Sequence, residues 1–278
     1  MELFTALLAG LLALLSPANL ILERISENAI RSRLSGAETL AIRLDNTPNH
    51  QITQGKVDGL RLAARGLEPI DGLRIAVFEV ETDPIDLDLQ RLRRERGNFR
   101  DSLQRPLQGN LRLVLTEADL NQALQSPEVR SRLETSLENA PESLRRRLEN
   151  LEIAELRVEF LPSNRLALNA QFQALPGQPP AALAVRLETG LAIAQGRRLQ
   201  LLDPSGTING RPLSRSVLKG LAEGLSRRLD LGLFEARGLT ARLLELEVNE
   251  DALQLAAFLR IENPPNSASL SSIPSGLE

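Results

Sequence analysis

Apolar and polar residues alternate at every second position along much of the chain, a pattern that predicts β-strands. In the first half this alternation predicts strands at 39–45, 57–65 and 73–81, and it returns at Leu111, Leu113 and Leu115. In the second half it predicts strands near 151–161, 165–175, 181–194, 198–203, 239–249 and 252–261. The pattern therefore indicates an α+β fold dominated by long antiparallel strands.

Helical spacing of apolar residues separates these strands in three places. An amphipathic helix is predicted at 23–35, and a helical insert at about 116–149, where Thr116, Pro127 and Pro141 are typical helix-starting residues. A longer helix is predicted at 213–231, with apolar side chains on one face: Val217, Leu218, Leu221, Leu225 and Leu229. We expect this helix to lie on the sheet.

The termini differ from the rest of the chain. Residues 1–22 form an almost uninterrupted apolar run that predicts a membrane-anchoring or docking helix, followed by a single α+β domain at 23–262 and a disordered tail at 263–278. The run could span a bilayer with a kink at Pro17, lie in one leaflet, or pack on the domain. Arginines after the run favour a membrane-associated protein on the cytoplasmic side, with the periplasm or cell envelope as the alternative.

Composition removes several classes of function. The chain has no Cys, Trp or Tyr, one His and a formal net charge of −3. It therefore forms no disulfide or thiolate metal site. The negative net charge and the absence of Trp and Tyr argue against nucleic-acid binding. The sequence contains no phosphate-binding loop, nucleophile elbow or dinucleotide fingerprint, so no cofactor and no catalytic residue are predicted.

Two polar clusters are candidates for binding sites. Asp86 and Asp88 are spaced to offer oxygen ligands to Ca²⁺ or to act as paired carboxylates, but the preceding Thr82–Pro84 is typical of a turn, and His50 is interpreted as a solvated loop residue. We predict no metal site. Four clustered arginines are candidates for binding an anionic headgroup, with a solvated, locally ion-paired helix as the alternative: Arg91, Arg93, Arg94 and Arg96.

The aliphatic faces of the strands and of the 213–231 helix could form an ordinary core or line a groove for a ligand. If they line a groove, the candidates for contact with acyl chains are Leu40, Ile42, Leu44, Leu60, Leu62, Ile75, Val77, Leu113, Phe172, Val185, Leu218 and Leu221.

Five short strings together resemble the LmeA-like phospholipid-binding family, in the version found in photosynthetic bacteria. They lie at 27–31, 45–48, 54–58, 82–87 and 115–124, and the resemblance extends from about Ile21 to Ile261. It implies a long twisted antiparallel sheet curled around amphipathic helices, similar to tubular lipid-binding domains. It also implies phospholipid as a partner and a role in the cell envelope or internal membranes.

The sequence thus predicts a non-catalytic protein that binds or transfers phospholipid at a membrane surface. One alternative is a membrane-associated scaffolding protein with a closed core, whose protein partner the sequence does not identify. A lipid-directed enzyme using Asp83, Asp86 or His50 is the third hypothesis.

Overall fold

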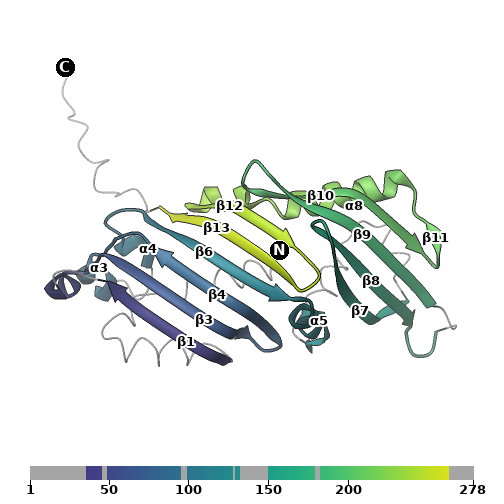
Figure 1. The fold of residues 1–278 in the computed structure, drawn as a ribbon, viewed down its shortest axis with the longest axis horizontal. Coiled ribbons are helices and arrows are strands. Elements are labelled where there is room, and N and C mark those ends of the chain that lie inside the picture. Colours follow the sequence, from purple (N-terminus) through teal and green to yellow (C-terminus); the bar gives the residue numbers. More distant parts are fainter. Residues whose placement is uncertain are drawn as a thin grey trace, which may run out of the picture.

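A computed structural model describes residues 36–45, 49–94, 99–127, 129–131, 150–178 and 182–262. The first of its two large sheets has six antiparallel strands in the order β1-β3-β4-β6-β13-β12 (Figure 1). Their bounds are Gly36–Asp45 (β1), Gly59–Ile70 (β3), Leu73–Thr82 (β4), Leu107–Thr116 (β6), Leu239–Val248 (β12) and Ala252–Ile261 (β13).

The second large sheet has five antiparallel strands in the order β11-β10-β9-β8-β7. Their bounds are Leu151–Leu161 (β7), Arg165–Ala174 (β8), Ala182–Ala194 (β9), Arg198–Ile208 (β10) and Arg211–Pro212 (β11). A small third sheet pairs Lys56–Val57 (β2) with Ile85–Asp86 (β5). The two large sheets lie end to end along the long axis of the molecule (Figure 1).

Helices lie at the ends of the sheets and between them. Leu89–Arg94 (α3) and Phe99–Ser102 (α4) lie at one end of the first sheet, and Glu117–Gln125 (α5) lies between the two sheets (Figure 1). Arg215–Arg228 (α8) runs along β10, and Leu231–Arg237 (η3) packs on β12. A further 3₁₀ turn, Asn49–Gln54 (η2), precedes β2.

Each large sheet has one apolar and one charged face. Across the first sheet Leu40 pairs with Ala64, Ala64 with Phe78, and Phe78 with Leu113, so these side chains share a face. The opposite face carries ion pairs between neighbouring strands, such as Arg61 to Glu81 and Arg112 to Glu79. Strand alternation thus directs aliphatic residues to one side of the sheet.

The second sheet repeats this division. Leu168 pairs with Val158 and Leu187, and Val185 pairs with Ala170 and Ile208, which gives a face of aliphatic residues. The other face carries charged pairs such as Arg165 with Glu188.

Asn164, in the turn between β7 and β8, joins the second sheet to the edge of the first. Its Oδ1 accepts from Val248 N at 2.7 Å, its Nδ2 donates to Leu246 O at 3.2 Å, and its own carbonyl accepts from Leu191 N at 2.7 Å. Its φ of 57° lies in the left-handed region, which Asn adopts more readily than most residues. This one residue therefore satisfies backbone groups of both sheets.

Helix α5 makes a second junction, along the free edge of β7. Glu117 Oε2 accepts from Phe160 N at 2.7 Å, Asn121 exchanges two bonds of 2.8 Å with the backbone of Val158, and Gln125 Nε2 donates to Leu156 O at 3.1 Å. The three side chains recur every four residues, so they share one face of the helix. They occupy the backbone groups that a neighbouring strand would otherwise bind.

Apolar contacts fill the space between these junctions. Phe160 and Leu191 of the second sheet form a buried cluster with Leu246 and Val248 of the first, and Leu120 of α5 packs against it. The apolar faces of the two sheets therefore meet, and one aliphatic surface extends from β1 to β7.

The structure confirms the predicted strands and the long helix, although the bounds of several of them differ from the prediction. The predicted 198–203 strand continues to Ile208 as β10, because Gly206 lies within the strand and the turn falls at Asn209–Gly210. The predicted predominance of antiparallel strands is confirmed, and the structure combines open antiparallel sheets with some helices, as an α+β class implies. The predicted elements at 1–22, 23–35 and 263–278 lie outside the described residues, as does most of the 116–149 insert after residue 131.

No helix among the described residues is long and apolar enough to cross a membrane.

Replacing Asn164 tests the junction between the sheets. We expect Asn164→Ala to lower the free energy of unfolding by about 2–4 kcal/mol, because two side-chain hydrogen bonds are lost and alanine disfavours a positive φ. Asn164→Gly loses the same bonds but accepts the φ, so its loss should be smaller by about 1 kcal/mol. Urea denaturation followed by circular dichroism measures both. Equal losses would show that backbone conformation does not contribute.

Candidate functional site

The half of the aliphatic surface on the first sheet is largely closed. Leu231 and Phe234 of η3, with Leu87 and Leu103 beside α3 and α4, belong to the same buried cluster as the sheet residues. Five of the predicted acyl-contact residues are buried in this cluster: Leu40, Leu60, Leu62, Ile75 and Leu113. Ile42 and Leu44 are partly buried and pack against it. The structure therefore brings these seven residues together as a packed core.

Val77 occupies a different face. It pairs with Arg65 on β3 and with Val114 on β6, and Arg65 is exposed and ion-paired with Glu79. Ile75, two residues earlier on the same strand, is nevertheless buried together with its cross-strand partner Leu67. Val77 thus lies on the charged side of the sheet.

The half on the second sheet is more open. Phe172 and Val185, both predicted to contact acyl chains, are only partly buried. Five neighbours on the same face are also partly exposed: Ile153, Leu168, Leu183, Leu187 and Ile208. These five are not among the predicted acyl-contact residues, although the same two-residue period along β7 to β10 places them beside Phe172 and Val185. They form what we call the open aliphatic face.

A groove of about 830 Å³ lies between α8 and β10. Its apolar lining includes Ala194, Leu201, Leu218 and Ala222. Its basic lining includes Arg198, Arg215, Lys219 and Arg227, against the acids Asp203 and Glu223. Of the two helix residues predicted to contact acyl chains, Leu218 is buried and lines the groove, whereas Leu221 is partly exposed and does not line it.

Asp230 fixes the end of α8 to β10. Its Oδ2 accepts from Arg198 Nη2 at 2.7 Å and from Nε at 3.1 Å, and its Oδ1 caps η3 by accepting from Gly232 N at 2.8 Å. Burial alone would raise the pKa of Asp230, but the hydrogen bonds from Arg198 and Gly232 and the charges of Arg198 and Arg197 together lower it. The carboxylate is therefore held ionised beside the groove.

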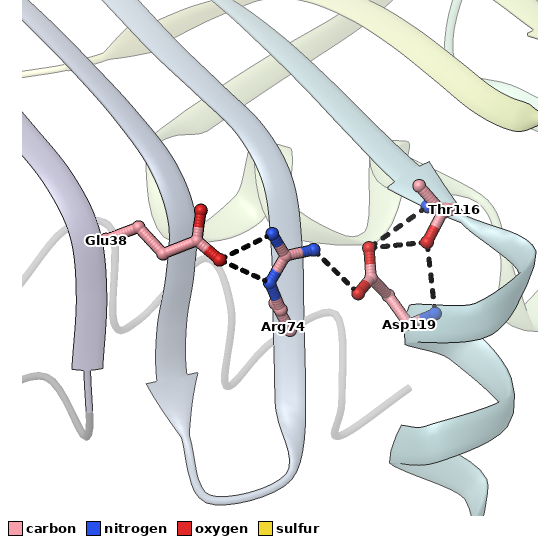
Figure 2. A network of polar contacts seen from close by, with 4 residues as sticks. All are labelled: Glu38, Arg74, Thr116 and Asp119. Atoms are coloured by element: carbon pink, nitrogen blue, oxygen red, sulfur yellow. Dashed lines mark hydrogen bonds and ion pairs between the residues drawn. The ribbon is translucent and has the colours of Figure 1, made fainter.

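Arg74 on β4 links β1 to the first turn of α5 (Figure 2). Its Nη2 donates to Glu38 Oε1 and its Nη1 to Asp119 Oδ1, each at 2.8 Å. These two hydrogen bonds raise the pKa of Arg74, and the bond to Glu38 has the larger effect. Asp119 also completes a capping box with Thr116, so the polar network orients the helix that seals β7.

Of the four arginines predicted to bind a headgroup, the structure describes the side chain of Arg91 alone. Arg91 on α3 is partly buried, and its Nη1 donates to Asp101 O at 3.2 Å. Arg93 and Arg94 belong to α3, but their side chains, like all of Arg96, lie outside the described part of the structure. Arg91 is thus the one candidate with a described contact.

Of the two aspartates that are candidates for a Ca²⁺ site, Asp88 has a structural role. Asp88 Oδ1 accepts from Gln90 N and Arg91 N, each at 2.9 Å, so it caps α3. Asp86 lies in β5 opposite Lys56. Among the described residues no group of three or more potential ligands is placed to hold a metal ion.

These features define an antiparallel-sheet protein with a long aliphatic surface, closed over one sheet and partly open over the other, which is the kind of surface that accommodates an apolar ligand. The chain belongs to the LmeA-like phospholipid-binding family, whose family model matches residues 13–258. No curated protein and no solved structure matches the chain.

The lowered pKa of Asp230 predicts how stability depends on pH. Its contribution is present above the unfolded-state pKa of about 3.9 and is lost as the pH falls through the lower folded-state value. We expect Asp230→Asn to lower the free energy of unfolding by about 1–3 kcal/mol at pH 7, and by less at about pH 3, which is below the unfolded-state pKa. Urea denaturation at both pH values measures the difference. A loss independent of pH would mean that the charge of Asp230 is not what stabilises this junction.

Proposed function

We propose that this protein binds a phospholipid and shelters its acyl chains on the open aliphatic face of the second sheet. The observation that carries the proposal is a row of aliphatic side chains across four adjacent strands that remains partly exposed. Membership of a phospholipid-binding family supports the choice of ligand.

The energetics favour a surface of this type. Two acyl chains of about 16 carbons lose on the order of 20 kcal/mol of favourable free energy when moved from a bilayer to water. A protein that removes such a lipid from a membrane must therefore replace nearly all of that apolar contact. A broad face of Leu, Ile, Val and Phe without charged residues offers such contact, because it requires no desolvation of polar side chains.

The proposal also specifies how the lipid is held, where the protein acts and what role it has in the cell. The sheets and helices would surround the acyl chains as in tubular lipid-binding domains, and Arg91, Arg93, Arg94 and Arg96 would contact the headgroup. The protein would associate with a membrane on its cytoplasmic side and act without catalysis in lipid transfer or in maintenance of an envelope or internal membrane. The residues of the closed core, such as Leu62 and Leu113, would contact lipid only if the segments that close this core moved away from the first sheet.

A membrane-associated scaffolding role is the second candidate. The observation that favours it is the closed half, where η3 and the segments around α3 and α4 already bury the apolar face of the first sheet. If residues outside the described part of the structure cover the open aliphatic face as fully, the protein would have a closed core and would bind a protein partner instead.

Mass spectrometry of organic extracts separates these candidates. Protein purified without detergent should release phospholipid at about one molecule per chain, because a lipid on a sheltered aliphatic face dissociates slowly into water. A mock purification controls for carried-over membrane. An absence of phospholipid, combined with no uptake from vesicles, would favour the scaffolding role.

A pair of adjacent substitutions tests where the lipid lies. Val185→Asp places a charge on the open aliphatic face and should reduce bound phospholipid at least about tenfold, because a carboxylate next to acyl chains loses hydration. Ala184→Asp places the same charge on the exposed opposite side of β9 and should leave lipid binding unchanged. Circular dichroism checks that both variants fold. Equal lipid content in both would contradict this position.

A further inference from the structure

Helix α8 exposes a row of apolar side chains. Leu218 and Ala222 are buried, but Val217 is 49% exposed and Leu225 is 44% exposed, with the partly exposed Leu221 between them. Val217, Leu221 and Leu225 follow one another at intervals of four residues, so they form a single row on the helix. Burying this row against another apolar phase would be favourable.

The side of α8 next to this row is uncovered. Among the described residues, and apart from its neighbours in the helix backbone, a Cβ atom added at Gly220 or at Gly224 would meet no atom within 4 Å. Packing against neighbouring atoms therefore gives no reason for glycine at either position, although glycine within a helix is unfavourable by about 1 kcal/mol relative to alanine. The helix thus presents a low, open surface beside Val217.

The charge of α8 differs from that of the whole chain. The helix carries four basic residues and a single acid, whereas the chain has a net charge of −3. Lys219 Nζ lies 3.9 Å from Glu223 Oε1, so these two residues form an ion pair. Arg215, Arg227 and Arg228 have no ion-pair partner in the part of the chain that the structure describes. On the charged faces of the sheets, by contrast, arginines such as Arg61, Arg112 and Arg165 are ion-paired.

We propose that α8 is the surface by which this protein docks on an anionic lipid bilayer. Amphipathic helices with a basic polar face lie in the plane of the bilayer interface, with their apolar side chains among the acyl chains and their cations at the headgroups. A second copy of the chain fits this surface poorly, because pairing two α8 helices would bring like charges together. The proposal rests on the proposed phospholipid-binding function and identifies the surface that meets the membrane.

A single-tryptophan reporter tests this docking surface in the full chain. Because the chain contains neither Trp nor Tyr, the fluorescence of Leu225→Trp comes from that position alone. With phosphatidylcholine vesicles containing about 30% phosphatidylglycerol, we expect its emission to shift to the blue and to be quenched by brominated acyl chains. Leu175→Trp, at an exposed leucine following β8, is the matched control and should keep its aqueous emission.

Two outcomes would overturn the proposal. In the first, the protein floats with the vesicles but Leu225→Trp keeps its aqueous emission, which would place the docking surface elsewhere. In the second, the blue shift appears without vesicles and depends on protein concentration, which would show that a second copy covers α8. Phospholipid content measured on the same preparation distinguishes failure of docking from failure of the lipid-binding function.

Charge substitutions test the electrostatic part. The triple variant Arg215→Gln, Arg227→Gln, Arg228→Gln should bind these vesicles about a hundredfold more weakly, since each cation near an anionic surface contributes roughly fivefold. The control variant Arg43→Gln, Arg61→Gln, Arg65→Gln removes three cations from the charged face of the first sheet and should change binding less than about threefold. Equal weakening by both variants would refute a specific role for α8.

Discussion

The structure depends on how the backbone groups at the edges of its two sheets are satisfied. Unpaired N–H and C=O groups are costly when water is excluded, and the sheets meet where Phe160, Leu191, Leu246 and Val248 exclude it. Side-chain amides and a carboxylate take the place of a neighbouring strand there: Asn164 binds β12, and Glu117, Asn121 and Gln125 bind β7. These bonds therefore lower the cost of excluding water where the two apolar faces meet.

Charged residues are arranged differently on the sheets and around α8. On the sheets, arginines and acids pair across strands on the side opposite the aliphatic residues, so each sheet has a solvated face that does not compete for the apolar ligand. Around α8 the cations outnumber the acids. Asp230 joins the two regions, because the same carboxylate neutralises Arg198 of β10 and caps the turn that follows α8.

Much of this fold could be predicted from the sequence, because strand alternation and helix periodicity are local properties. The strands at 151–161 and 252–261 were predicted with their observed bounds. The junctions could not be predicted, since Asn121 and Asn164 resemble ordinary helix and turn residues until Val158 and Val248 are placed beside them. Among the candidate site residues, periodicity identified apolar positions such as Leu62 and Val185 but not their burial. Burial depends on which segments cover each face: residues of η3 and beside α3 and α4 belong to the buried cluster of the first sheet, whereas Val185 lies outside that cluster.

The side chains of α5 have a consequence for the protein in a crowded cell. An exposed strand edge is a template for pairing with the strands of other molecules, and a sheet with a partly open apolar face would be especially prone to such aggregation. Between Leu156 and Phe160, the outward backbone groups of β7 are already bound by Glu117, Asn121 and Gln125. Helix α5 therefore blocks pairing of β7 with a strand of another molecule, while the aliphatic face of the sheet remains accessible.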